Sequence, residues 1–147
     1  MHIARCNAEM LSQWVGLPFA LWPDEDRDIM VREAPGILAR PDMLVLVARQ
    51  GDSVTGFAEA SVRRDYVNGC KTSPVAFVEG IYVAPEHRHQ GVARALIAAV
   101  EHWARAHNLR ELASDALLDN AQSHAMHRAL GFSETERVVY FRKTLPP

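Results

Sequence analysis

The sequence predicts an α+β protein in which helices pack on a mixed sheet. Apolar runs at residues 43–48 and 54–62 flank the string Gln-Gly-Asp-Ser, which indicates an antiparallel hairpin. Further along, a helical period over residues 91–103 lies between extended segments at 75–83 and 111–115, which is typical of a β-α-β unit. Both features together predict a sheet that is partly antiparallel and partly parallel.

The N-terminal elements are a short strand at residues 2–6 and two helices. Asn7 is expected to cap the first helix, which ends before Pro23. The second helix has an acidic start and runs to about Leu38. Pro35-Gly36 predicts that this second helix is irregular or short.

The remaining elements complete the sheet. Residues 64–74 are rich in turn formers and predict a long connection. A last helix is expected to begin at a cap, Asp119 or Asn120, and to end at Gly131. Residues 132–143 are predicted to be an extended final strand with Val-Val-Tyr-Phe at its centre.

Composition excludes several classes of protein. The 147 residues carry 16 Lys plus Arg against 18 Asp plus Glu, and this net charge of −2 argues against a nucleic-acid partner. No run of about eighteen apolar residues exists, so no membrane span is expected. With two cysteines and no signal pattern, a cytoplasmic location is expected. No repeat or linker divides the chain, so residues 1–147 are predicted to form a single domain.

The most informative stretch is the strand at residues 79–85 and the basic turn that follows it. Unpaired N–H groups and the dipole at the start of the next helix favour an anion there. Gly91 and Ala93 are small enough for a phosphate to approach the main chain. On these residues alone, an anion site and an ordinary strand-to-helix loop are about equally good interpretations.

Two motifs resemble the GCN5-related N-acetyltransferase (GNAT) family. Arg-x-x-Gly-x-Ala at residues 88–93 is followed, at the family's usual distance, by Asn-x-x-Ser-x-x-Met-His-x-x-x-Gly-Phe at residues 120–132. The order of elements is also similar over essentially the whole chain. The resemblance implies a GNAT-type mixed, mostly antiparallel central sheet with helices on both faces, splayed at a site for acetyl-CoA.

The same resemblance implies which residues hold acetyl-CoA. The main chain of Ile81, Tyr82 and Val83 would pair with the pantetheine arm, and Asn120 would lie near that arm. Gly80 suits a bulge that splays this strand. The turn residues that would hold the pyrophosphate are Arg88, His89, Gln90, Gly91, Val92, Ala93 and Arg94.

A narrower resemblance is to the aminoglycoside 6′-N-acetyltransferases, one branch of that family. The specific strings are Asp-Tyr-Val-Asn-Gly at residues 65–69 and Gly-Phe-x-Glu-Thr-Glu-Arg at residues 131–137. They imply direct acetylation of the 6′-amine of an aminoglycoside in a ternary complex, and hence antibiotic resistance. Enzymes of this branch are often dimers, so a homodimer is expected.

Amine acetylation requires a group that accepts the proton of the amine. An alkylammonium with a pKa near 10.4 costs about 4–5 kcal/mol to neutralise at pH 7, so a carboxylate must take that proton. Glu79 is the sharpest candidate because it interrupts an apolar strand beside the cofactor segment; the alternative is a strand residue that faces solvent. Asp115, which ends the next strand, is the second candidate and could instead be a loop or capping acid.

Other residues are expected to complete an acidic acceptor pocket. Glu25 could bind an ammonium group or belong to a solvated helix start. Trp22 could line the site or the core, and Tyr66 could pack on a sugar ring or lie on the surface. The full set of expected substrate-binding residues is Trp22, Glu25, Tyr66, Glu79, Asp115 and Glu136.

His127 departs from the family pattern, which commonly has a tyrosine there as the acid for the leaving thiolate. A neutral imidazole is a poor acid, and free imidazole is mostly neutral at pH 7. His127 is therefore a catalytic candidate in doubt, and a plain helix residue is at least as good an interpretation. The pairs His87/His89 and His124/His127 lack thiolate partners, so no metal is expected.

Two other functions stay open. The chain could acetylate another amine, such as a polyamine, a small metabolite or a protein N-terminus, or it could be a non-catalytic sensor of acyl-CoA. The acids favour a polycationic acceptor. Residues 85–110, in contrast, hold four arginines against two glutamates, so the near-zero net charge combines a basic site with an acidic one.

Overall fold

The centre of the protein is a five-stranded sheet in the order β1-β2-β3-β4-β5. The strands are β1 (His2–Arg5), β2 (Met43–Gln50), β3 (Ser53–Arg63), β4 (Val75–Val83) and β5 (Leu112–Ser114). The first four strands pair with one another in antiparallel fashion, and β5 runs parallel to β4. The predicted mixed, mostly antiparallel sheet is therefore confirmed.

The computed structural model describes the main chain of residues 1–147 and every side chain except those of residues 15 and 19. Contacts divide the chain into two compact units, residues 1–115 and 116–147, which are described separately. In this described part, no helix is long and apolar enough to cross a membrane.

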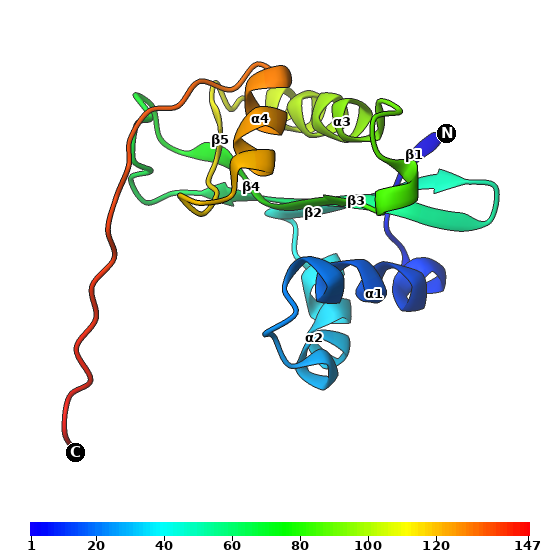
Figure 1. Cartoon of the computed structure of the whole chain (residues 1–147), viewed down its shortest axis with the longest axis horizontal. Coiled ribbons are helices and arrows are strands. Elements are labelled where there is room, and N and C mark those ends of the chain that lie inside the picture. Colours follow the sequence, from blue (N-terminus) through cyan, green and yellow to red (C-terminus); the bar gives the residue numbers. More distant parts are fainter. The chain divides into compact units, whose positions relative to one another are not determined.

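Helices cover both faces of the sheet in the larger unit. The helices are α1 (Leu11–Leu21), preceded by the 3-10 turn η1 (Ala8–Met10), then α2 (Arg27–Ala39), the 3-10 turn η2 (Pro85–His87) and α3 (Val92–Ala106). Figure 1 shows α1 and α2 on one face and α3 on the other. The core under α1 and α2 is built from Trp14, Ala34, Val45, Val47 and Phe57.

Asn7, the predicted cap of the first helix, caps the 3-10 turn η1 that precedes α1, and α1 itself begins without a side-chain cap. The Oδ1 atom of Asn7 accepts a hydrogen bond from the main chain of Met10, and Asp26 caps α2. The second helix ends close to the predicted Leu38, and the expectation that Pro35-Gly36 shortens it is wrong, because α2 continues to Ala39. Pro35 cannot donate the main-chain hydrogen bond of a helix interior, and the fully buried Ala34 beside it shows that α2 packs on the core at this point.

A bulge interrupts the pairing of β3 with β4. Glu59 lies opposite Gly80, whereas the next residue, Ala60, lies opposite Val78, so Glu79 is the extra residue. The parallel strand β5 pairs only with the stretch of β4 that precedes the bulge, from Ala76 to Val78. The pairing of β4 with β5 therefore ends next to the bulge, where the sequence predicts that β4 splays.

The smaller unit contains α4 (Ala121–Ala129) and the C-terminal segment. Asn120 caps α4, and Gly131 follows its end with φ +93°, both as predicted. Residues 132–147 form no strand with any described residue, and Figure 1 shows them as an open chain. The predicted final strand is therefore wrong for the single chain, because a strand needs a partner for its N–H and C=O groups.

Gly80 is expected to be intolerant of a side chain. A Cβ atom at this position would lie 2.5 Å from the ring of Trp22, so Gly80→Ala must displace the ring or the bulge. We expect Gly80→Ala to lower the free energy of unfolding by about 1–3 kcal/mol in urea denaturation.

The matched control for this substitution is Gly36→Ala, because a Cβ atom there meets nothing within 4 Å inside helix α2. We expect the control to raise the free energy of unfolding by about 0.5–1 kcal/mol. Equal stability of the two variants would contradict the close packing of Trp22 on Gly80.

Candidate active site

Glu79 is held at the bulge by two residues of β3. Ser61 Oγ donates a hydrogen bond of 2.6 Å to Glu79 Oε1. Arg63 donates through Nε to Oε1 at 2.9 Å and through Nη2 to Oε2 at 2.7 Å. Its guanidinium also lies over the ring of Phe77, 3.5 Å from the centroid. Glu79 is thus a fixed carboxylate rather than a strand residue that merely faces solvent.

A second acid, Glu59, lies in the same part of the sheet and was not expected from the sequence. It precedes Ser61 and Arg63 by two and four residues on β3, which places all three on one face of the strand. Its side chain is 8 % exposed. Burial, and then the charge of Glu79, raise the pKa of Glu59 to about 7. The available signal was an acid in the middle of the apolar run at residues 54–62.

Trp22 connects this acidic site to the core. It follows the last turn of α1, and its ring lies against Gly80 and packs edge-on with Phe57, 6.1 Å between centroids. The interpretation of Trp22 as a residue packed on the core is confirmed, and its role as a wall of the site stays a prediction. The ring covers the bulge on the face that carries Glu59.

The edge of β4 beyond the bulge matches a binding site for an extended ligand. The N–H of Ala84 donates to the carbonyl oxygen of Thr55 on β3. Successive residues of a strand direct their main-chain N–H and C=O groups to opposite sides, so those of Ile81 and Val83 point away from β3. No described strand pairs with that side. Tyr82 points its main chain to β3, so of the three expected residues only Ile81 and Val83 direct theirs to the open side, where the carbonyl oxygen of Val83 already accepts a hydrogen bond from Arg88.

The turn between β4 and α3 has the geometry of an anion site. Gly91 stands at the start of α3 with φ +81°, and no side chain caps the first N–H groups of the helix. A Cβ atom on Gly91 would meet nothing within 4 Å, so the space beside this main chain is open. His89 is also left-handed, with φ +60°. These features fit the pyrophosphate of a CoA-type cofactor.

Side chains of the turn have further roles. Arg88 Nε donates to the carbonyl oxygen of Val83 at 2.8 Å, so part of this arginine ties the turn to β4. Gln90 donates to the carbonyl oxygen of Glu86 at 3.3 Å. Arg94 is exposed on the first turn of α3. Arg88 and Gln90 thus stabilise the conformation of the turn through these hydrogen bonds.

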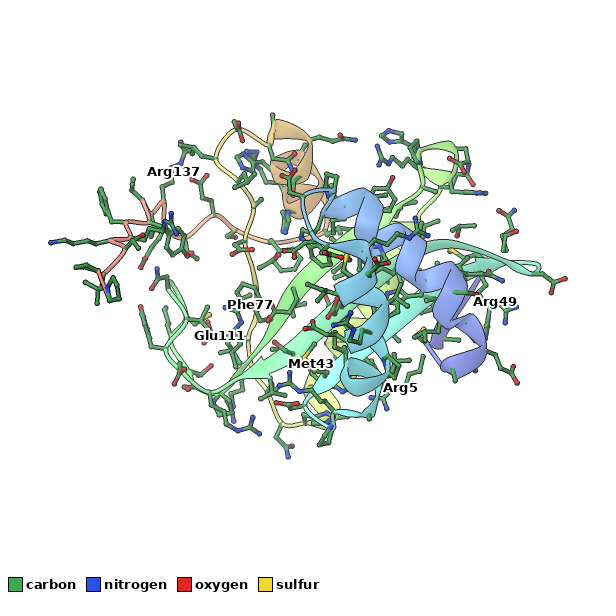
Figure 2. The ribbon with its side chains drawn as sticks, turned by 90° about the horizontal axis from the view of Figure 1, so that it is seen from below. Arg5, Met43, Arg49, Phe77, Glu111 and Arg137 are labelled. Atoms are coloured by element: carbon green, nitrogen blue, oxygen red, sulfur yellow. The ribbon has the colours of Figure 1, made fainter. Side chains whose placement is uncertain are left out.

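Glu111 fastens the long loop that carries Tyr66. Its Oε1 atom accepts hydrogen bonds from the main chain of Lys71 and Thr72 at 2.8 and 2.7 Å, and from Thr72 Oγ1 at 2.6 Å. The hydrogen bonds from Thr72 hold the pKa of Glu111 below its usual range. Tyr66 itself is 70 % exposed. Figure 2 labels Glu111 close to Phe77, at the end of the sheet where this loop begins.

The other expected acids of the larger unit lie at its surface. Asp115 follows β5, as predicted, and is exposed. Glu25 is exposed in the turn between α1 and α2, whereas its neighbour Asp26 is a helix cap. No hydrogen bond described for these residues joins Asp115 or Glu25 to Glu79.

Three expected site residues belong to the smaller unit. Asn120 uses its Oδ1 atom to cap α4 by accepting from Ser123. His127 Nδ1 lies 2.7 Å from the carbonyl oxygen of Ser123, so this nitrogen carries a proton and donates it. In the neutral ring Nε2 then has no proton to give, which weakens an acid role. Glu136 is exposed in the C-terminal segment.

Comparisons with known proteins agree with this geometry. The model of the acetyltransferase (GNAT) family matches residues 8–132. An aminoglycoside N(6′)-acetyltransferase type 1 of Acinetobacter baumannii is 47% identical over 146 residues, which cover 99% of each chain. The protein belongs to the GNAT family of acetyltransferases.

Two solved structures resemble the whole chain. The apo crystal structure of the aminoglycoside 6′-N-acetyltransferase AAC(6′)-Ig from Acinetobacter haemolyticus has a TM-score of 0.94 and 46% identity, covering 99% of this chain and 100% of that one. AAC(6′)-Iy in complex with the bisubstrate analogue CoA-S-monomethyl-acetylneamine has a TM-score of 0.93 and 44% identity, covering 98% of each chain.

Proposed function

We propose that the protein transfers the acetyl group of acetyl-CoA to the 6′-amine of an aminoglycoside by direct attack in a ternary complex. The observation that carries the proposal is the fixed carboxylate of Glu79 at the bulge, beside an open strand edge and an uncapped helix start. A cationic amine is attracted to the first feature, and an anionic cofactor fits the other two. The family and the names of the similar enzymes support the same reaction.

The basic half of the site holds the cofactor. Acetyl-CoA, when bound, supplies an acetyl group activated as a thioester. The main-chain N–H groups at Gly91, Val92 and Ala93 bind its pyrophosphate, with Arg88, His89, Gln90 and Arg94 around them. The main chain of Ile81 and Val83 orients the pantetheine arm, and Asn120 is proposed to lie near it.

The acidic half binds the acceptor and takes up its proton. Glu79 attracts the ammonium group and holds it beside the edge of β4. Asp115, Glu25 and Glu136 are proposed to bind the other ammonium groups of a polycationic acceptor. Trp22 and Tyr66 are proposed to contact its rings, and His127 is left without a role as an acid.

Neither cysteine has the properties of an acyl carrier. Burial raises the pKa of Cys6 to about 11. Burial and then Glu111 raise the pKa of Cys70. Both side chains are therefore thiols near neutral pH, which supports direct transfer to the amine without an acyl-cysteine.

The reaction is tested by following thiol release from acetyl-CoA with a panel of amines. We expect turnover of aminoglycosides that carry a 6′-amine and none of their 6′-hydroxyl analogues. We expect Glu79→Gln to lower kcat/KM at least about 100-fold, because the amide cannot accept the proton. Expression of the wild type is expected to raise the aminoglycoside concentration that a susceptible bacterium tolerates.

The control variant is Glu101→Gln, which removes a carboxylate of α3 that pairs only loosely with Arg105 at 3.9 Å. It is expected to keep wild-type kcat/KM. Turnover of polyamines or N-terminal peptides but not of aminoglycosides would contradict the proposed acceptor. Binding of CoA without turnover of any amine would instead identify a sensor.

We also propose that the protein acts as a homodimer in the cytoplasm, where acetyl-CoA is made. The C-terminal segment supports this proposal, because its apolar side chains are exposed on the single chain. They are Val138, Val139, Tyr140, Phe141 and Leu145. A second copy offers this segment a place to bury them. Fractionation of expressing cells tests the location; recovery in a membrane or extracellular fraction would contradict it.

The dimer is tested by the double substitution Val139→Asp and Phe141→Asp, whose side chains share one face of an extended chain. We expect sedimentation to give a dimer for the wild type and a monomer for this variant. Leu117→Asp is the control, since Leu117 is as exposed as Val139 at 76 % but lies outside the segment. A monomeric wild type at micromolar concentration would contradict the proposal.

A further inference from the structure

Glu59 is a buried ionisable residue without a role in the acetyl transfer proposed above. Glu59 lies in the middle of β3, opposite Gly80 at the bulge, and its side chain is 8 % exposed. Among the described ion pairs, none involves Glu59. A buried carboxyl without a cation costs free energy unless it is neutral or serves a function.

The charged groups near Glu59 are few. Glu79 and Arg63 are on the same face, and they bind one another. Helix α1, which packs on this face, contains no ionisable residue. Strand β2 contributes only Arg49, which pairs with Val54 and lies in Figure 2 at the opposite end of the sheet from Phe77. The charged residues of α2 are all exposed; they are Arg27, Asp28, Arg32 and Glu33.

The neighbouring carboxylate differs from Glu59 in its surroundings. Glu79 accepts three hydrogen bonds, two of them from a guanidinium, so its charge is compensated and its oxygens are engaged. Glu59 has burial and a like charge beside it, and both favour the neutral form. Because its pKa is raised to about 7, Glu59 can gain or lose a proton near neutral pH when a charged group binds beside it.

We propose that Glu59 is a positioning residue that acts through Glu79: it keeps a proton while the acceptor site is empty, and it loses that proton when a cationic amine binds beside Glu79. A second negative charge then faces the ammonium only while the ammonium is there. This inference rests on the proposed acetyl transfer and names the group that stores the proton of the amine.

The protons of one turnover balance in this scheme. Binding of the ammonium releases the proton of Glu59 to solvent. The ammonium then gives one proton through Glu79 to Glu59, which restores the neutral acid and leaves a neutral amine. The amine forms the C–N bond as the C–S bond breaks, and its second proton goes to the departing sulfur. The net products are an amide, a thiol and one proton.

The kinetic test compares the wild type with Glu59→Gln and Glu59→Asp over pH 5.5–8.5. We expect kcat/KM of the wild type for neamine to rise with pH through about 7, since low pH opposes loss of the Glu59 proton. In Glu59→Gln this rise is expected to vanish, and kcat/KM at pH 8 is expected to fall at least 10-fold. Glu59→Asp, which keeps a carboxyl, is expected to regain part of the rate and the pH dependence.

Proton release on binding gives a readout that packing alone does not change. Calorimetry of neamine binding at pH 6.5, in buffers of different ionisation enthalpy, is expected to show up to one more proton released by the wild type than by Glu59→Gln. Unchanged affinity for CoA shows that a variant is folded. If Glu59→Gln loses affinity for CoA, Glu59→Asp is compared with the wild type instead. Glu59→Asp is expected to keep the release of a proton on neamine binding.

The outcomes separate this inference from the proposed function. If the wild type acetylates neamine, but the Glu59 variants match its pH profile and its proton release, the inference about Glu59 is wrong and the reaction stands. If the wild type binds neamine with the extra proton release but turns over no amine, the proton role stands and the proposed transfer fails.

Discussion

The constraint on which the site depends is the bulge in β4, where Glu79 is an extra residue. The bulge requires glycine at position 80, because the ring of Trp22 occupies the space of a side chain. It also marks the point beyond which β5 no longer pairs with β4. A single irregularity therefore directs Glu79 toward Ser61 and Arg63, and opens the strand edge that presents Ile81 and Val83. The placement of the acid and the open strand edge have one structural cause.

The bulge in β4 also determines the electrostatic character of the site. Moving Glu79 onto the face of Glu59 puts two carboxyls together under α1, a helix without charges. One of them is compensated by Arg63, whereas burial and then the charge of its neighbour raise the pKa of the other to about 7. Such a pair suits a polycationic acceptor, which brings the missing positive charge with it. The uncapped start of α3 supplies the opposite polarity for an anionic cofactor.

Much of this could be predicted from the sequence because it depends on local signals. Periodicity predicted the strands and helices, and Asn7 and Asn120 predicted the caps of η1 and α4. The motif at residues 88–93 predicted an anion turn, and the structure shows a left-handed Gly91 and a helix start without a side-chain cap there. Glu59 and the clamp of Glu111 were missed, because both depend on residues far away in the chain. Local rules failed at Pro35, where α2 continues although an interior proline lacks a donor, and at residues 132–143, which pair with no described residue. The single domain stays a prediction.

The central claim, that the bulge couples two carboxyls, is tested most directly by NMR titration of ¹³C-labelled glutamate side chains. Glu59 is assigned by the signal that Glu59→Gln removes, and the titration is repeated in Glu79→Gln. We expect Glu59 to titrate near pH 7 in the wild type and distinctly lower in Glu79→Gln, because the repulsion from Glu79 is gone. A midpoint near 4.5 in the wild type, or one that Glu79→Gln leaves unchanged, would contradict the account.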